Sequence, residues 1–217
     1  MRVKICGIKS VEDGLKAVEF GADAIGLLVG QEHSSKDFIS ISLAKEIVSK
    51  MPPFISTVLV THINNAEQII DMIKEIGVNT VQLHSDIDIN GINKVKNNCP
   101  NVKVIKLVHI IDENSIEQVK LFTDVSNAIL LDTINFATNQ VGGTGKTHNW
   151  DIDKKIVEET SANIIVAGGL NKNNVKEAVL KIKPFGVDVN SGVQNEFGFK
   201  DYDKLKEFIY NAKYVEG

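Results

Sequence analysis

The most constraining feature of this sequence is a regular alternation of short apolar runs and amphipathic stretches, repeated eight times. The runs are rich in Val, Ile and Leu and contain few charges. Runs that are apolar on both faces are typical of strands in a parallel sheet covered by helices. The predicted strands are Val3–Cys6, Ala24–Val29, Ile55–Val60, Thr80–Leu83, Lys103–Leu107, Ala128–Leu131, Asn163–Ala167 and Gly186–Val189.

Between the runs, apolar residues recur at helical spacing, and helix-stop residues such as Gly21, Gly77 and Pro184 precede several strands. The predicted helices are Val11–Phe20, Ser42–Met51, Ala66–Ile76, Ile89–Lys96, Ser115–Phe122, Ile152–Glu159, Asn174–Ile182 and Tyr202–Ala212. Eight strand–helix units in 217 residues predict a (β/α)8 barrel, or TIM barrel, as a single domain over residues 1–217. A doubly wound sheet would need about five or six units and usually a glycine-rich first loop, whereas Gly7 is the only glycine there.

Composition narrows the classes of partner. The net charge of −4 and the pI near 5.8 provide no general attraction to nucleic acid or to an anionic membrane. No apolar run approaches the roughly 20 residues that cross a bilayer, and the N-terminus enters a strand without a signal peptide. The two cysteines, Cys6 and Cys99, fit neither a disulfide framework nor a metal-binding spacing. We therefore expect a cytoplasmic protein without a metal, as a monomer or a homodimer.

Nearly every predicted strand ends in a polar residue or a glycine. In a barrel of this type, ligands are held on the loops after the strands. Strand one ends at Cys6, and strand three ends in Thr61-His62. Strand four ends with Gln82 and His84, and strand eight ends with Asp188. Polar ends at seven or eight strands predict a ring of ligand-binding loops.

Two glycine-containing strand ends are candidate phosphate sites. Gly168 and Gly169 follow strand seven, and Ser191 and Gly192 follow strand eight. Glycine allows the backbone to approach an anion closely, and loops seven and eight bind phosphate in many barrels. The alternative is that these glycines only form tight turns, but their occurrence at adjacent strands favours phosphate.

A third glycine cluster, Val141–Thr147, lies after strand six. It resembles part of a nucleotide P-loop, but that motif would need a glycine at Gln140. We interpret it as a loop that closes over substrate, with Gly143 as a further phosphate-binding candidate. A surface turn fits the spacing equally well.

Cys6 and Asp132 end strands one and six and are the candidate acid–base pair. Across a small barrel mouth, two such side chains can flank a sugar. A cysteine acts as a base when its pKa is lowered, with Lys4 and His84 as local influences, and otherwise it is a small buried hydrophobe. Asp132 stands among apolar residues, which favours the protonated form of a general acid; the alternative is a carboxylate that caps a loop.

Motifs along almost the whole chain resemble one family. They are Val3-Lys-Ile-Cys-Gly-Ile8, Gly21-Ala-Asp-Ala-Ile-Gly26, Val81-Gln-Leu-His84, Leu130-Leu-Asp-Thr133, Gly142-Gly-Thr-Gly-Lys146 with Trp150, Ala167-Gly-Gly-Leu-Asn171 and Pro184-Phe-Gly-Val-Asp-Val-Asn-Ser-Gly-Val193. In this order they resemble phosphoribosylanthranilate isomerase of tryptophan biosynthesis.

The resemblance implies a TIM barrel without a cofactor that performs an Amadori rearrangement. The aminoaldose phosphoribosylanthranilate becomes the aminoketose carboxyphenylamino-deoxyribulose phosphate. By resemblance, Asp132 protonates the ribose ring oxygen and opens the ring to a Schiff base, and the Cys6 thiolate removes the proton from C2 of the sugar. The partner implied is a small phosphosugar, with Lys36, Gln82, His84 and Asp188 as candidate substrate-binding residues.

Two segments depart from the family pattern. After strand two, the family has an arginine that is expected to bind the anthranilate carboxylate, whereas this chain has Asp37, with Lys36 or His33 as the nearest cations. A lysine does not reproduce a bidentate guanidinium clamp. After strand three, the usual Phe-Val-Asn is Leu59-Val-Thr-His62. The alternatives are therefore a paralogous isomerase or epimerase of another phosphosugar, or a non-catalytic phosphosugar-binding protein.

Overall fold

The computed structural model describes residues 1–30, 36–135, 140–141 and 149–215. Its strands are β1 (Arg2–Ile5), β2 (Ala24–Leu28), β3 (Ser56–Thr61), β4 (Thr80–Leu83), β5 (Lys103–Ile110), β6 (Ala128–Asn135), β7 (Gln140–Val141), β8 (Ile164–Val166) and β9 (Gly186–Val189). The helices are α1 (Val11–Glu19), α2 (Ile41–Lys50), α3 (Ala66–Ile76), α4 (Ile89–Asn98), α5 (Ser115–Phe122), α6 (Trp150–Glu159), α7 (Val175–Ile182) and α8 (Tyr202–Lys213), with a 3-10 turn, η1, at Ser191–Val193.

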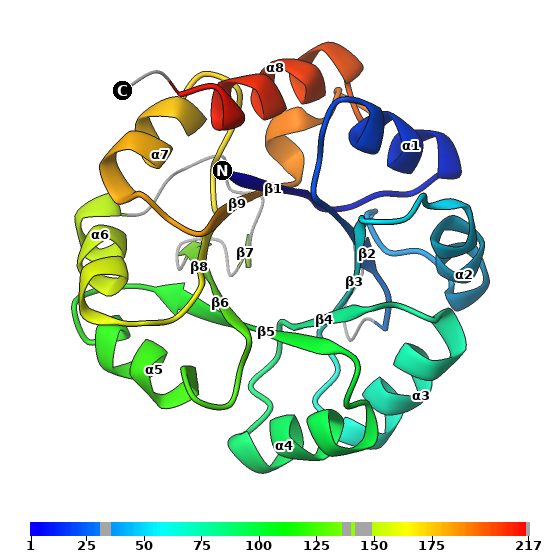
Figure 1. Cartoon of the computed structure of the whole chain (residues 1–217), viewed down its shortest axis with the longest axis horizontal. Helices are drawn as coiled ribbons and strands as arrows, with labels where there is room; N and C mark the ends of the chain where they lie inside the picture. The colour runs from blue at the N-terminus through cyan, green and yellow to red at the C-terminus, as the bar shows by residue number, and fades with distance from the viewer. Residues whose placement is uncertain (31–35, 136–139, 142–148, 216–217) are drawn as a thin grey trace.

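The strands form a closed parallel barrel. They follow the order β5-β4-β3-β2-β1-β9-β8-β6, and pairing of β5 with β6 closes the ring. The helices surround this ring on the outside (Figure 1). The predicted (β/α)8 fold is therefore confirmed.

Strands β5 and β6 are longer than the sequence indicated, which is a correction to two predicted boundaries. Their ladder continues through the pairs His109–Asp132 and Ile110–Thr133. The expected strands ended at Leu107 and Leu131 because the polar residues beyond them were interpreted as loop. Since both strands keep their hydrogen-bonded partner, the polar residues continue the sheet. The short strand β7, which pairs antiparallel with the end of β6, was not expected.

The local sequence explains why these elements form where they do. The side chain of Asn65 caps α3 by accepting a hydrogen bond from the Gln68 N–H at 3.1 Å. Gly77 ends the same helix with a φ of 80°, which favours glycine. Alternation along β1 then separates the two faces, since Val3 and Ile5 belong to the core under the helices, whereas Cys6 belongs to the cluster inside the barrel.

Candidate functional site

Cys6 lies at the carboxyl end of β1, on the face that points into the barrel. Its N–H donates to the Val189 carbonyl at 2.8 Å, which fixes the end of β1 beside β9. Gly26 of β2 leaves room for the thiol, because a Cβ at that position would lie 2.9 Å from Cys6 Sγ. The cysteine is 6 % exposed and forms no disulfide.

A buried ion pair lies next to this thiol. Lys4 Nζ and Asp188 Oδ1 are 3.0 Å apart, and both residues are buried inside the barrel. The predicted site residue Asp188 is therefore placed beside Cys6, where its charge is neutralised by Lys4. Asp188 also raises the pKa of Lys4, which burial alone would lower.

The expected lowering of the Cys6 pKa is wrong in direction. Burial raises the pKa of the Cys6 thiol to about 11, and the Asp188 carboxylate adds to this increase. Lys4 and Lys200 act in the opposite direction but do not outweigh burial. The sequence showed the lysine at position 4 but not that its charge would be shared with Asp188.

Lys200 was missed by the sequence analysis. It lies in the segment before α8, is buried, and donates from Nζ to both the backbone carbonyl (3.2 Å) and Oδ1 (3.0 Å) of Asn190. Burial lowers the pKa of Lys200 to about 8, and the proximity of Cys6 and Asp37 limits that decrease. Nothing in the local sequence marks this lysine, because only the return of the chain before α8 brings it near β1.

Asp132 extends β6 into the mouth of the barrel. Its Oδ1 accepts a hydrogen bond from the N–H of Thr133 at 2.7 Å, and the residue is buried. Gly168 allows the end of β8 to approach it, since a Cβ there would be 2.8 Å from Asp132 Oδ1. Asp132 thus stands between β5 and the loop after β8.

The two glycine-containing loops are in direct contact, as expected for a joint anion site. Gly168 and Gly169 have φ values of 75° and 67°, which favour glycine. A Cβ on Gly192 would lie 2.0 Å from the Leu170 carbonyl oxygen, so only glycine allows this approach. Ser191 is exposed next to it. Gly143 and most of the third glycine cluster lie outside the described residues.

On the opposite side, the ends of β3, β4 and β5 present three half-buried histidines. The rings of His62 and His84 are 4.7 Å apart in an edge-to-face arrangement, and His62 makes a similar contact with Phe38 at 5.5 Å. Gln82 is fully buried, and its Nε2 lies 3.1 Å from Nδ1 of His84. Of the two predicted binding residues on β4, His84 therefore reaches the mouth and Gln82 lies behind it.

The loop after β2 differs from the expectation for Lys36 and Asp37. Asp37 is buried and accepts hydrogen bonds from Asn190 (3.0 Å) and Gln194 (3.1 Å), with Lys9 Nζ at 3.5 Å. It therefore ties this loop to the segment after β9. Lys36 is exposed, and a Cβ on Gly198 would lie 2.8 Å from its Nζ, so the structure does not bring Lys36 together with the other candidates.

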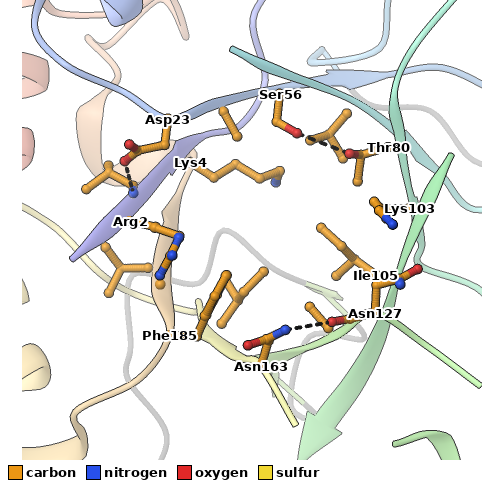
Figure 2. Close-up of a pocket in the computed structure, with 17 residues that line it drawn as sticks. Arg2, Lys4, Asp23, Ser56, Thr80, Lys103, Ile105, Asn127, Asn163 and Phe185 are labelled. Carbon is orange, nitrogen blue, oxygen red and sulfur yellow. Dashed lines mark hydrogen bonds between the residues drawn. The ribbon is translucent and has the colours of Figure 1, made fainter. Parts of the chain in front are cut away.

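A separate cavity of about 470 Å³ opens at the other end of the barrel (Figure 2). Its lining comes from the strand starts and includes Arg2, Lys4, Asp23, Ser56, Thr80, Lys103, Asn127, Asn163 and Phe185. Arg2 lies over the Phe185 ring, 4.1 Å from its centroid. Because catalytic groups of such barrels lie at the carboxyl ends of the strands, this cavity is distinct from the mouth that holds Cys6 and Asp132.

Together these features describe a (β/α)8 barrel whose mouth holds Cys6 and Asp132 between two contacting glycine loops and a histidine-rich wall. Among the described residues, no group of three or more His, Cys, Asp or Glu side chains is arranged to hold a metal ion. None of the helices in that part of the chain is long and apolar enough to cross a membrane.

Comparison with known proteins assigns this barrel to a family. The model of the N-(5'-phosphoribosyl)anthranilate (PRA) isomerase family matches residues 3–211. N-(5'-phosphoribosyl)anthranilate isomerase 2 of Methanosarcina mazei is 47% identical over 213 residues, covering 98% of this chain and 94% of that protein. The chain belongs to the PRA isomerase family.

Solved structures support the assignment. One is a PRA isomerase in complex with reduced 1-(o-carboxyphenylamino)-1-deoxyribulose 5-phosphate, with 35% identity, a TM-score of 0.84 and 98% coverage of both chains. Another is a monomer generated from the dimeric enzyme of Thermotoga maritima, with 34% identity, a TM-score of 0.84 and the same coverage.

Proposed function

We infer that this chain is an isomerase that converts N-(5'-phosphoribosyl)anthranilate to carboxyphenylamino-deoxyribulose phosphate, the activity of its family. The observation that carries the roles of individual residues is the strand order around the mouth. Cys6 on β1 and Asp132 on β6 are both placed between the glycine loops after β8 and β9 and the wall formed by β3, β4 and β5. A substrate with phosphate at one end and an aromatic acid at the other then has its sugar between the two groups.

The first step belongs to Asp132. Its protonated carboxyl donates a proton to the ring oxygen of the ribose, the C1–O bond breaks, and the anthranilate nitrogen forms a protonated Schiff base with C1. The close approach of Gly168 and the hydrogen bond from Thr133 hold this carboxyl in place. General acid catalysis of this type contributes typically 10²–10⁴-fold to the rate.

The second step belongs to Cys6. Its thiolate removes the proton from C2, the electron pair moves to the Schiff base nitrogen, and the resulting enolamine rearranges to the ketose. In the resting enzyme the pKa of about 11 keeps the thiol protonated. The cationic Schiff base formed in the first step favours the thiolate, because an opposite charge nearby lowers a thiol pKa. The base is thus activated after ring opening, and no cofactor is needed.

Phosphate recognition is assigned to the contacting loops after β8 and β9. Gly168 and Gly169 adopt the left-handed backbone that glycine favours, and Gly192 lets its loop contact Leu170, so the two loop backbones lie side by side and can offer N–H groups to one anion. A crystal soaked in phosphate should contain an anion between these loops. An occluded or empty site there would argue against the assignment.

Turnover of phosphoribosylanthranilate by the purified protein tests the function directly. Cys6→Ser and Asp132→Asn should each abolish turnover while leaving the affinity for the reduced product analogue within several-fold, since each removes a proton-transfer group and little volume. Turnover of another phosphosugar, with none of phosphoribosylanthranilate, would instead support a paralogous isomerase or epimerase. Binding without turnover of either would support a phosphosugar-binding protein, and complementation of a tryptophan auxotroph would decide the cellular role.

We further propose that the chain forms a homodimer through the end of the barrel that carries the cavity. Phe54, in the loop between α2 and β3, is completely exposed and has a φ of 69°, which is rare for a bulky residue. This loop lies at the same end as the cavity, whose interior is apolar at Ala24, Val58, Ile105, Ala128 and Ile165 (Figure 2). Reciprocal insertion of Phe54 would bury both in an isologous interface. The related enzyme of Thermotoga maritima is described as dimeric.

A cytoplasmic location is also part of the proposal. It is supported by two free buried cysteines, which persist best in a reducing compartment. The net charge of −4 supports a small-molecule partner rather than nucleic acid.

A further inference from the structure

A second cavity, of about 620 Å³, lies beside the carboxyl end of β5, between the loop after β4 and α5. In the described part of the chain, α4 and α5 contact each other less than any other neighbouring pair of helices around the ring (Figure 1). The cavity therefore occupies the place where the layer of helices is most open. His84 and His109 also belong to its lining, so it borders the mouth of the barrel.

Lys106 places a positive charge in the wall of this cavity. Along β5, Ile105 and Leu107 belong to the cluster inside the barrel, whereas Val104 and Val108 pack under the helices. The side chain of Lys106 therefore points outward, away from the interior that contains the proposed acid and base. The residue is nevertheless only 5 % exposed. A lysine at this position is unusual, because the same face of the strand is otherwise apolar.

The hydrogen-bond partners of this ammonium group are neutral. Its Nζ donates to the backbone carbonyls of Ser85 at 2.8 Å and Leu107 at 2.9 Å, and lies 5.3 Å from the centre of the Phe122 ring. Burial lowers the pKa of Lys106 to about 8, and the charge of Asp86 only partly opposes that decrease. Since an ammonium has three N–H donors, these bonds leave one donor for a further acceptor.

Exposed apolar side chains surround the same cavity. Ile89 at the start of α4, Ile111 after β5 and Leu121 on α5 are 39 %, 55 % and 63 % exposed, and all three line it. Single exposed hydrophobic residues are common on protein surfaces, but several that converge on one concavity are typical of a binding site. A mostly apolar cavity with a few polar groups is also the usual form of a small-molecule site.

We propose that this cavity binds a small carboxylic acid with an apolar body, whose carboxylate accepts the remaining N–H of Lys106. The body then covers Ile89, Ile111 and Leu121, and the carboxylate supplies the counter-charge that the buried ammonium lacks among its hydrogen-bond partners. A single negative charge fits this site better than a phosphate dianion, because the exposed Asp86 and Asp88 also line it and repel a higher charge. This site goes beyond the proposed function and does not depend on it.

Two matched probes test the site, hydrocinnamate and its neutral amide. Each is titrated at pH 7 into the full-length, isotope-labelled protein, and the backbone amide shifts in the NMR spectrum give both the affinity and the place of binding. The acid should bind at least tenfold more tightly than the amide, because only the acid forms a charge-assisted hydrogen bond with Lys106. Both probes should shift residues of the loop after β4 and of α5.

Three variants identify the groups that bind. Lys106→Met should remove the preference for the acid and leave the affinity for the amide within threefold, with Lys106→Gln as the second variant if the first fails to fold. Lys103→Met is the matched control, because Lys103 is an exposed lysine at the other end of β5, and it should keep the preference. Leu121→Trp fills the cavity from an exposed position and should weaken both probes by tenfold or more.

Several results would overturn the proposal. They are equal affinity for the acid and the amide in the wild type, no binding of either, or a preference that persists in Lys106→Met. Displacement of hydrocinnamate by the reduced product analogue would assign the probe to the mouth instead. A change of oligomeric state in Leu121→Trp would assign the apolar residues to a contact between copies of the chain. Because none of these measurements uses turnover, failure of the proposed isomerase activity would leave their outcome unchanged.

Discussion

At the scale of single residues, the proposed mechanism depends on Cys6, whose pKa is raised by burial. Because burial raises the pKa of Cys6 to about 11, the free enzyme should contain little thiolate at neutral pH. As a base must be deprotonated to act, kcat/KM should increase with pH across the alkaline range toward that value, as long as the protein stays folded. Steady-state assays from pH 7 to 10 measure this increase.

Cys6→Ser is the control for this profile. A serine hydroxyl does not ionise in the same range, so any residual activity should be at least 10²-fold lower and should lose the alkaline increase. A wild-type profile that is flat above pH 7 would mean that another group is the base, or that the thiolate forms without help from the substrate.

Asp37 shows what a residue comparison alone cannot reveal. The sequence places it where the family has an arginine, which would favour Asp37→Arg as a means to tighten binding of the product analogue. The structure contradicts that interpretation, since Asp37 is buried and accepts hydrogen bonds from Asn190 and Gln194 beside Lys9. Removal of one partner of a buried ion pair costs about 3–5 kcal/mol.

Asp37→Arg should therefore lower the free energy of unfolding by about 3 kcal/mol or more, because it also adds a positive charge near Lys9 and Lys200. Urea unfolding measures the effect. Asp37→Asn keeps the shape and one acceptor, so a smaller loss of about 1–2 kcal/mol is expected. Equal stability of the wild type and the arginine variant would show that the side chain at 37 is free to leave this network.

At the scale of elements, the anion site depends on the contact between the loops after β8 and β9. A Cβ on Gly192 would lie 2.0 Å from the Leu170 carbonyl oxygen, a backbone atom that moves only with its loop. Gly192→Ala should therefore separate the loops and raise KM by tenfold or more with a smaller change in kcat. Steady-state kinetics measure both constants.

Gly77→Ala is the matched substitution. Gly77 ends α3 in open space, with nothing within 4 Å of an added Cβ, but with a φ of 80°. This variant should lose about 1 kcal/mol of stability from the unfavourable backbone conformation and keep its KM. An unchanged KM in Gly192→Ala would show that phosphate binding does not depend on the contact between the two loops.

A comparison of predicted and observed bounds shows which elements could be predicted from the sequence. Apolar periodicity and helix-capping residues predicted α3 and α5 with their observed bounds, because amphipathic spacing is a local property. The ends of β5 and β6 were not predictable in the same way, since polar residues there stay in the sheet only through their partner strand. The structure brings Cys6, Asp132, His84 and the glycine loops to one end of the barrel, as the sequence predicted, because the carboxyl ends of parallel strands meet there. Lys200 was not found, because its neighbours are set by the path of the chain before α8.

At the scale of the whole molecule, the two ends of the barrel have different tasks. The carboxyl ends of the strands hold Cys6, Asp132, the glycine loops and the histidine-rich wall, to which the proposed function assigns the chemistry. The opposite end holds a cavity with an apolar interior (Figure 2). The exposed Phe54 lies in the loop before β3 at that same end. Sequence patterns predicted the first end through its polar residues, whereas the second became visible only once the strand starts were assembled into a ring.

The dimer proposed for that second end gives a prediction about the assembled protein. If Phe54 of each copy enters the cavity of the other, the wild type should elute as a dimer at micromolar concentration, and its Tm should rise with protein concentration. Phe54→Asn should elute as a monomer with a Tm independent of concentration. Asparagine tolerates a positive φ, so its folded monomer should not be less stable for reasons of backbone strain. Analytical ultracentrifugation and thermal unfolding over a hundredfold concentration range measure both properties.

Phe197→Ser is the comparison, because Phe197 is also exposed, at 72 %, but lies in the segment after β9 at the opposite end of the barrel. This variant should remain dimeric. Since the dimer surface is remote from Cys6 and Asp132, Phe54→Asn should retain turnover under conditions in which the monomer stays folded. A wild type that is monomeric at all concentrations, or a dimer that persists in Phe54→Asn and dissociates in Phe197→Ser, would place the interface elsewhere and leave the cavity without this occupant.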